Sequence, residues 1–227
     1  MDRLILGDGM LGSELVRQTG WDYVSRKKDG IDFTDFRSYR DYLKDYDEVI
    51  NCIGYVNTYD TDRTKHWDIN YKGVDTLVRL CNLFHQKLIH ISSDYVYSNS
   101  VSNASENDVP VHCRNWYGYT KLLSDGIVQL NSDNFLLIRT SFKEKPCKHS
   151  KGWMIEGNFD YVDVISKKIV DLVNTGVDGI YNLGTDKKTL FELGKQTNVN
   201  IQPTTEYIDE SVPEDVSMNL TKLKSVL

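Results

Sequence analysis

The chain has 227 residues, a formal net charge of −6, 40% hydrophobic residues and 26% charged residues. This length suits one domain, or one domain with a small appendage, and is enough to bury a core without disulfide or metal staples. A mildly acidic chain without a basic stripe argues against nucleic acid as the main partner. The longest apolar runs span only a few residues, so we expect no membrane-crossing helix.

The start of the chain and its cysteines indicate the compartment. The first residues lead straight into a strand pattern, so no signal peptide is expected. The cysteines lie far apart without a C-x-x-C pair, and the histidines show no metal-ligand spacing, which favours reduced thiols and no metal site. We therefore expect a cytoplasmic protein. The single alanine, Ala104, hints at an AT-rich and viral coding sequence, in which case the compartment is a host cytoplasm.

Short apolar runs alternate with amphipathic stretches over the first 140 residues. In chain order, the pattern predicts a strand at 3–6, a helix at 11–18, a weak strand at 23–24, a helix at 33–44, a strand at 48–52, a helix at 61–84, a strand at 87–92, a helix at 116–130 and a strand at 135–138. Strands that alternate with helices imply βαβ units. The predicted fold class is therefore α/β, with a doubly wound, Rossmann-like parallel sheet.

The pattern loosens in the last third of the chain. Residues 141–157 show no clear periodicity, whereas 162–173 predict a helix, 179–183 a short strand and 189–195 a short helix. We expect this part to form a smaller lobe, with one helix and one strand completing the sheet.

A glycine-rich turn follows the first predicted strand and opens the first predicted helix. Residues 7–12 read Gly-Asp-Gly-Met-Leu-Gly and match the pattern G-x-G-x-x-G. Such glycines allow a tight turn and let the backbone approach a pyrophosphate, which then lies at the positive end of a helix. The alternative is a turn without a ligand, but its position in the first βα unit favours a dinucleotide.

A basic segment lies where a dinucleotide site selects its ribose. Residues 25–28 read Ser-Arg-Lys-Lys, and no acidic residue ends the second predicted strand. Basic side chains suit a 2′-phosphate, so NADP(H) is preferred and NAD(H) remains possible. The alternative is a solvated basic loop.

Tyr117 and Lys121 form a Y-x-x-x-K pair at the start of a predicted helix. Their spacing puts both side chains on one helical face, where an ammonium beside a phenol lowers the tyrosine pKa. Such a tyrosine can pass a proton to a carbonyl that is being reduced. Ser93 ends the fourth predicted strand, where open α/β sheets bind ligands, and its hydroxyl can bond the same oxygen. The alternative is that Tyr117 and Lys121 are simply two exposed residues of a helix.

Taken together, these segments resemble an extended short-chain dehydrogenase/reductase, and within it the dTDP-4-dehydrorhamnose reductase family. The resemblance rests on the glycine turn, on ISSDYVYS at 91–98 and on YGYTK at 117–121. Further segments match the family in the same order, at 32–35, 49–55, 70–73, 106–117, 138–141 and 212–222. Members reduce the 4-keto group of a nucleotide-linked 6-deoxy sugar with NAD(P)H.

The resemblance implies a role for each matching residue. Tyr117 would be the catalytic proton donor, Lys121 its electrostatic partner and a ribose contact, and Ser93 would bind the substrate carbonyl. The residues implied to bind substrate are Ser93, Asp94, Tyr95, Phe142 and Trp153, the last of which could instead merely cover the sheet. The residues implied to bind the cofactor, besides Tyr117 and Lys121, are Gly7, Gly9, Met10, Leu11, Gly12, Ser25, Arg26, Asp32, Phe33, Cys52, Ile53, Gly54, Tyr55 and Asn70.

The segment between Ser141 and Tyr161 is shorter than in members of this family. We therefore predict an NAD(P)-binding domain at 1–140 and a reduced substrate-binding lobe at 141–227. The predicted function is reduction of a nucleotide-activated 4-keto-6-deoxy sugar for a surface glycan, by a possible homodimer. Two alternatives stay open: a non-catalytic cofactor-binding regulatory subunit of the same fold, and a nucleotide-sugar 4-epimerase.

Overall fold

A parallel sheet of six strands lies at the centre of residues 1–60, 62–207 and 210–227, which the computed structural model describes. Its strands, in spatial order, are β10 (Gly179–Asn182), β5 (Phe135–Arg139), β4 (Lys87–Ile91), β3 (Glu48–Asn51), β1 (Arg3–Leu6) and β2 (Asp22–Val24). The strand order reverses between β1 and β3. In open α/β sheets, ligands bind at such a switch point, outside the carboxyl ends of the strands.

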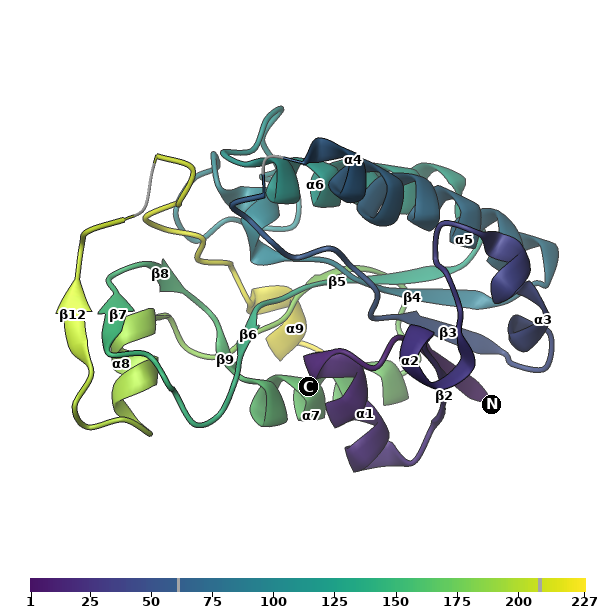
Figure 1. Cartoon of the computed structure of the whole chain (residues 1–227), viewed down its shortest axis with the longest axis horizontal. Helices are drawn as coiled ribbons and strands as arrows, with labels where there is room; N and C mark the ends of the chain where they lie inside the picture. The colour runs from purple at the N-terminus through teal and green to yellow at the C-terminus, as the bar shows by residue number, and fades with distance from the viewer. Residues whose placement is uncertain (61, 208–209) are drawn as a thin grey trace.

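Helices cover both faces of this sheet (Figure 1). One face carries α5 (Gly73–Leu83) and α6 (Trp116–Asn131), and the other carries α1 (Met10–Thr19) and α7 (Val162–Asn174). The predicted doubly wound α/β fold is thereby confirmed. Two cores result, because successive strand residues point to opposite faces. Leu4 and Leu6 of β1 lie in the core under α5, whereas Ile5 lies in the core under α1 and α7.

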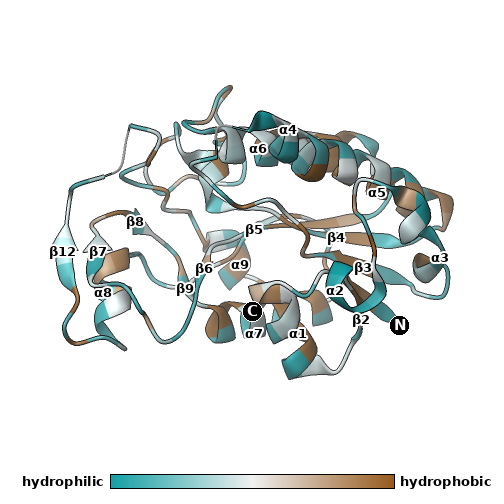
Figure 2. Ribbon diagram, in the orientation of Figure 1, coloured by the Kyte–Doolittle hydropathy of each residue, from teal (hydrophilic) through white to brown (hydrophobic). Residues whose placement is uncertain are grey.

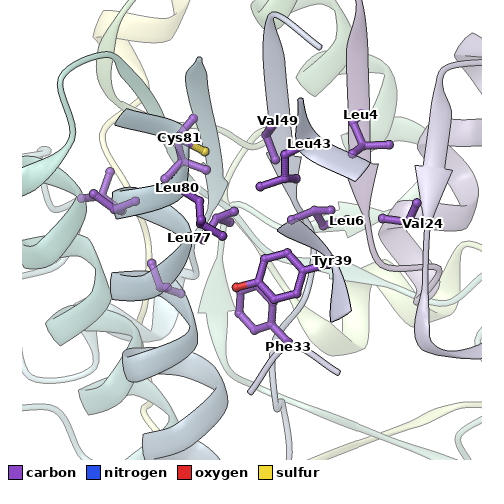
Figure 3. Close-up of a cluster of buried hydrophobic side chains, with 14 of the residues drawn as sticks. Leu4, Leu6, Val24, Phe33, Tyr39, Leu43, Val49, Leu77, Leu80 and Cys81 are labelled. Carbon is purple, nitrogen blue, oxygen red and sulfur yellow. The ribbon is translucent and has the colours of Figure 1, made fainter. Parts of the chain in front are cut away.

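Hydropathy follows this layering. Figure 2 shows hydrophobic residues in strands of the central sheet, whereas the helices carry both hydrophobic and hydrophilic residues. The core under α5 continues into the segment after β2, where the Phe33 ring stacks on Tyr39 with 5.6 Å between ring centroids (Figure 3). Both rings are buried beside Leu77 of α5 and Leu43.

The smaller lobe is built from short paired strands. Strand β6 (Phe142–Lys143) pairs with β9 (Asp160–Tyr161), β7 (Lys151–Trp153) with β12 (Gln202–Thr204), and β8 (Glu156–Gly157) with β11 (Lys188–Thr189). Helix α8 (Leu190–Lys195) packs on β7, and α9 (Thr221–Lys224) packs on β10. Although α7 and β10 come late in the chain, they belong to the central layers: α7 contacts α1, and β10 pairs with β5.

The predicted single helix at 33–44 is wrong. The segment holds a short 3-10 turn, η1 (Phe36–Ser38), and one turn of helix, α3 (Arg40–Leu43). The Asp32 carboxylate accepts hydrogen bonds from the backbone and hydroxyl of Thr34, and the Asp35 carboxylate accepts one from Arg37 N. These side chains compete with helical backbone bonds and favour turns. A second short helix, α2 (Arg26–Asp29), precedes this segment.

The predicted helix at 61–84 is present from residue 63, and residue 61 lies outside the described residues. It runs through α4 (Arg63–Lys65), a π-helical stretch, η2 (His66–Lys72), and α5. Irregularities of this kind are frequent at functional sites. Here the π-helical stretch carries Asn70, whose side chain bonds both the backbone N–H and the carbonyl of Tyr55.

A buried ion pair joins α6 to β5. The Arg139 Nε donates to the Asp125 carboxylate at 2.8 Å, and neither side chain is more than 1% exposed. The same guanidinium donates to the Tyr97 hydroxyl, which donates in turn to Asn182 of β10. Tyr97 closes the 3-10 turn η3 (Asp94–Tyr97) that follows β4. This network therefore ties β5, α6, η3 and β10 together. No helix in the described part of the chain is long and apolar enough to cross a membrane.

We predict that Arg139→Met lowers the free energy of unfolding by about 3–5 kcal/mol, because it leaves the Asp125 carboxylate buried without its partner. Urea unfolding measures this loss. Arg79→Met is the control, since it removes an exposed pair with Asp75 and should cost far less. Equal losses in the two variants would contradict the structural role of the buried pair.

Candidate active site

The glycine turn forms a cradle at the end of β1. Gly7 has a φ of +99°, and a Cβ on Gly12 would lie 2.0 Å from the Gly7 carbonyl oxygen, so neither position tolerates a side chain. Gly9 precedes α1, and a Cβ there would meet nothing within 4 Å. In the described chain no side chain caps the first turn of α1. Its free backbone N–H groups and the open space at Gly9 fit a pyrophosphate.

The segment after β3 closes the other side of this cradle. The side chain of Ile53 packs against Gly7, and the Cys52 side chain lies beside Gly12. Asn70 holds Tyr55 by its backbone, so residues 52–55 lie along the same edge as the glycine turn. The structure therefore brings these residues together as predicted from their motifs. Leu11 is an exception, because its side chain is buried in the core beneath α1.

The basic segment after β2 is partly used by the protein itself. Ser25 is buried and caps α2, with its Oγ accepting from Lys28 N at 3.0 Å. Lys28 donates its Nζ to the Tyr23 carbonyl at 2.9 Å. Arg26 remains exposed at the carboxyl end of β2. Of the predicted residues nearby, Asp32 is exposed and its pKa is lowered by hydrogen bonds from Thr34, with a smaller contribution from Arg26.

Phe33, the neighbour of Asp32, does not face this edge. Its ring is 6% exposed and packs against Tyr39, and a Cβ on Gly73 would lie only 2.6 Å from it. Phe33 therefore supports α5 from within the core (Figure 3).

Ser93 and Tyr117 meet at the carboxyl edge of the sheet. The Ser93 hydroxyl follows β4, donates to Asp94 at 3.1 Å, accepts from Tyr95 N at 3.2 Å and hydrogen-bonds the Tyr117 phenol. Tyr117 stands in the first turn of α6, next to Gly118, where a Cβ would lie 2.7 Å from the Tyr95 carbonyl oxygen. This close approach of α6 to η3 sets the Tyr95 and Tyr117 rings 5.9 Å apart.

Lys121 lies one turn further along α6, but it does not act on Tyr117 as predicted. Its Nζ donates to the Ile91 carbonyl at 2.8 Å, and burial lowers the pKa of Lys121 to about 8. Burial raises the pKa of Tyr117 to about 12, and the hydrogen bond with Ser93 offsets only part of that rise. The predicted lowering of the Tyr117 pKa is therefore wrong, because desolvation of the phenol dominates and the lysine nitrogen is turned to the Ile91 carbonyl. Tyr117 is a protonated phenol at neutral pH, the form that can donate a proton.

A cavity of about 500 Å³ lies between the sheet edge and the smaller lobe. It brings together three predicted substrate residues from distant segments, Tyr95, Phe142 and Trp153, with Met10 from the glycine turn. Asp94 is 2% exposed and lies behind this wall, bonded to Ser93. Burial raises the pKa of Asp94, and the nearby Lys143 ammonium opposes that rise.

Lys143 is a residue that the sequence analysis missed. It lines the cavity, and its Nζ lies 3.3 Å from the Ser141 hydroxyl. Two other lysines at the cavity, Lys148 and Lys151, are paired with Glu144 and Glu206. Within the described residues, no carboxylate lies within 4.0 Å of the Lys143 ammonium. Its position directly after Phe142 was the available signal, but the segment shows no periodicity that would point it into a cavity.

The described residues contain no cluster of His, Cys, Asp or Glu side chains that could hold a metal ion. All four cysteines are free thiols. The arrangement can therefore hold a dinucleotide on the glycine turn and present a phenol and a hydroxyl to a small molecule in the cavity.

Comparison with known proteins places the first two thirds of the chain in a defined family. Residues 1–143 match the family model described as the RmlD substrate binding domain. The spore coat polysaccharide biosynthesis protein SpsK of Bacillus subtilis is 28% identical over 141 residues, which cover 59% of this chain and 50% of SpsK. A dTDP-4-dehydrorhamnose reductase of Mycolicibacterium smegmatis is 28% identical over 145 residues, covering 59% of this chain and 43% of that protein. The chain thus spans about half the length of these curated relatives.

A solved structure shares the fold over the whole length. The dTDP-4-dehydrorhamnose reductase of Bacillus anthracis, determined in complex with NADP, superposes with a TM-score of 0.84 at 20% identity. The match covers 99% of this chain and 91% of that one. The smaller lobe is therefore part of the shared architecture, although the sequence match ends near residue 143.

The geometry of the turn predicts that Gly12→Ala abolishes dinucleotide binding, since its Cβ would collide with the Gly7 carbonyl oxygen. Gly126→Ala is the matched control, because this glycine lies in α6 away from the turn and a Cβ there would meet nothing within 4 Å. Fluorescence titration with NADPH and urea unfolding measure the two effects. Unchanged affinity in Gly12→Ala would show that the turn is not the binding cradle.

Proposed function

The chain belongs to the RmlD substrate binding domain family, and from this premise we propose that it is an NAD(P)H-dependent reductase of a nucleotide-activated 4-keto-6-deoxy sugar. The observation that carries the proposal is the meeting of three features at one sheet edge. These are the glycine cradle, the Ser93–Tyr117 pair and the cavity lined by Tyr95 and Phe142. The product would be a deoxysugar for a surface glycan, made in the cytoplasm.

NADP(H) is the proposed cofactor, with NAD(H) as the second choice. The glycine turn at 7–12 would hold its pyrophosphate, residues 52–55 would border it, and Lys121 would contact its ribose. Arg26 is an exposed cation that a 2′-phosphate could reach, whereas Lys28 is already bonded to the Tyr23 carbonyl. When bound, the cofactor supplies the hydride for reduction.

The protein's own residues would manage the proton and the developing charge. Reduction turns a carbonyl oxygen into a hydroxyl, so that oxygen must gain a proton. The Tyr117 phenol, kept protonated by burial, donates it, and the Ser93 hydroxyl would turn its hydrogen from Asp94 to the same oxygen. Lys121, one turn along α6, would take part through its contact with the cofactor ribose.

The cavity supplies the binding surface for the sugar and its nucleotide. Phe142 and Trp153 give it apolar walls, and Lys143 is the cation available to a diphosphate or a sugar hydroxyl. In this proposal residues 1–140 form the cofactor-binding domain, and residues 141–227 contribute the substrate lobe. A nucleotide sugar is the expected partner molecule, and a homodimer the expected assembly.

The proposal predicts that Tyr117→Phe lowers turnover by about 100-fold or more, because the reaction loses its proton donor. NADPH consumption in the presence of a nucleotide 4-keto-6-deoxy sugar measures this. NADPH binding should be largely retained, because the variant removes only one hydroxyl group and leaves the glycine turn intact.

Tyr119→Phe is the matched control for this experiment. Its ring packs on His112 and Trp116 rather than on Ser93, so its turnover should stay near that of the wild type. Wild-type turnover in Tyr117→Phe would exclude it as the donor. A wild-type protein that binds NADPH but reduces no such sugar would instead favour the regulatory-subunit alternative.

The proposed 2′-phosphate contact predicts that Arg26→Gln raises the KM for NADPH about tenfold or more and leaves the KM for NADH nearly unchanged. Lys28→Gln should change either value little, because Lys28 is held by the Tyr23 carbonyl. Steady-state kinetics with NADPH and with NADH measure the two KM values of each variant and of the wild type. A wild-type enzyme that uses NADH as well as NADPH would overturn the proposed preference.

A further inference from the structure

A buried row of polar side chains runs beneath Lys121, and the mechanism above makes no use of it. Asn51 at the end of β3 and His90 in β4 are both 0% exposed, and Lys121 is 4% exposed. The Asn51 Nδ2 lies 3.2 Å from His90 Nδ1, and His90 Nε2 lies 3.3 Å from Lys121 Nζ. Both ring nitrogens of His90 therefore have a polar neighbour, and in a neutral imidazole only one of the two carries a proton.

The orientation of Asn51 answers this question for Nδ1. The backbone N–H of Ile53 donates to Asn51 Oδ1 at 3.0 Å, so the amide oxygen is turned toward Ile53 and the amide nitrogen toward His90. An amide nitrogen can only donate. His90 Nδ1 must therefore accept, and it carries no proton.

A neutral imidazole then carries its proton on Nε2. This N–H points to Lys121 Nζ at 3.3 Å and to the Ser124 hydroxyl at 3.4 Å. The Ser124 hydroxyl gives its own hydrogen to the Lys121 carbonyl at 2.8 Å. An imidazolium would need a second proton on Nδ1, facing the hydrogens of the Asn51 amide. Burial likewise lowers the pKa of His90 far below its usual value.

In this arrangement His90 presents its Nε2–H, a hydrogen-bond donor, to the nitrogen of Lys121. An ammonium group, which only donates, needs acceptors instead. One Lys121 hydrogen is taken by the Ile91 carbonyl at 2.8 Å. On the side of His90, an ammonium meets an N–H, but a neutral amine can accept from that N–H with its lone pair. The balance between the two forms of Lys121 therefore depends on which His90 nitrogen is protonated.

The other titratable and charged groups around Lys121 are accounted for. Asp125, one turn along α6, raises the pKa of Lys121, but its carboxylate is held by Arg139 at 2.8 Å. The Cys52 thiol stays protonated, because burial raises its pKa to about 12. Tyr117 is likewise a neutral phenol at neutral pH. His90 is thus the neighbour whose hydrogen-bonding state can change without a change in charge.

We propose that Asn51 and His90 are positioning residues for Lys121: Asn51 fixes the Nε2–H tautomer of His90, and this N–H holds the lysine nitrogen at the Ile91 carbonyl and favours its amine form. The inference rests on the proposed function only in giving Lys121 a part in the reaction. The tautomer and its effect on the lysine are properties of the protein alone.

Nuclear magnetic resonance of the wild-type protein, with nitrogen-15 in its histidines and lysines, tests the tautomer directly. We expect Nε2 of His90 to show the signal of a protonated ring nitrogen and Nδ1 that of an unprotonated one, unchanged between about pH 6 and pH 9. The spectrum of His90→Gln identifies the signals by their loss. A proton on Nδ1, or an imidazolium at neutral pH, would overturn the proposal.

Two variants at Asn51 then test the link to Lys121. In Asn51→Asp the carboxylate accepts from Nδ1–H, so the tautomer reverses, Nε2 becomes an acceptor, and the titration midpoint of Lys121 rises by about one pH unit or more. Asn51→Leu adds no charge but removes the donor to Nδ1, and it should raise the midpoint in the same direction. Ser124→Ala is the matched control and should leave the tautomer and the midpoint unchanged.

The outcomes separate this inference from the proposed function. An unchanged Lys121 midpoint in a folded Asn51→Asp protein with reversed tautomer would refute the link, as would a larger shift in Ser124→Ala than in Asn51→Leu. If the protein turns over nucleotide sugars, the pH profile of its turnover should shift upward with the lysine midpoint. If it reduces no sugar, the proposed function fails while the tautomer measurements still stand.

Discussion

The buried ion pair between Arg139 and Asp125 is the constraint on which the site depends. Asp125 lies one turn beyond Lys121 on α6, so the pair fixes to β5 the helix that carries both Tyr117 and Lys121. Through Tyr97 the same guanidinium also reaches η3, which follows Ser93. Two desolvated charges are costly to bury unless they are paired. Their pairing therefore holds Tyr117, Lys121 and Ser93 in one arrangement.

The alternation of strands and helices could be predicted from the sequence because β1, β3, β4 and β5 are almost wholly buried and alternate with amphipathic helices such as α1 and α5. The errors arise where side chains or distant partners decide the backbone. Asp32 and Asp35 replace the predicted helix at 33–44 with turns. The two-residue strands of the smaller lobe depend on partners far along the chain, such as Phe142 with Asp160, which a local pattern cannot reveal.

In the candidate site, too, local motifs predict some features and only the folded chain decides others. Ser93, Tyr117 and Lys121 could be found from their motifs, and the structure brings them to one edge. The pKa of Tyr117 could not be predicted, because it depends mainly on burial of the phenol and on its hydrogen bond with Ser93, both of which exist only in the folded chain. Lys143 and His90 were not singled out for the same reason: the cavity around the first and the Asn51 amide beside the second exist only in the folded chain.

Transfer of deuterium from labelled NADPH to the sugar tests the central claim most directly. The protein would be incubated with a nucleotide 4-keto-6-deoxy sugar and with NADPH that carries deuterium at the reactive carbon of its nicotinamide. The product would be examined by mass spectrometry and by proton nuclear magnetic resonance. The account predicts one deuterium per product molecule, located at C4 of the sugar. A protein that binds the labelled cofactor but yields no deuterated sugar would contradict it.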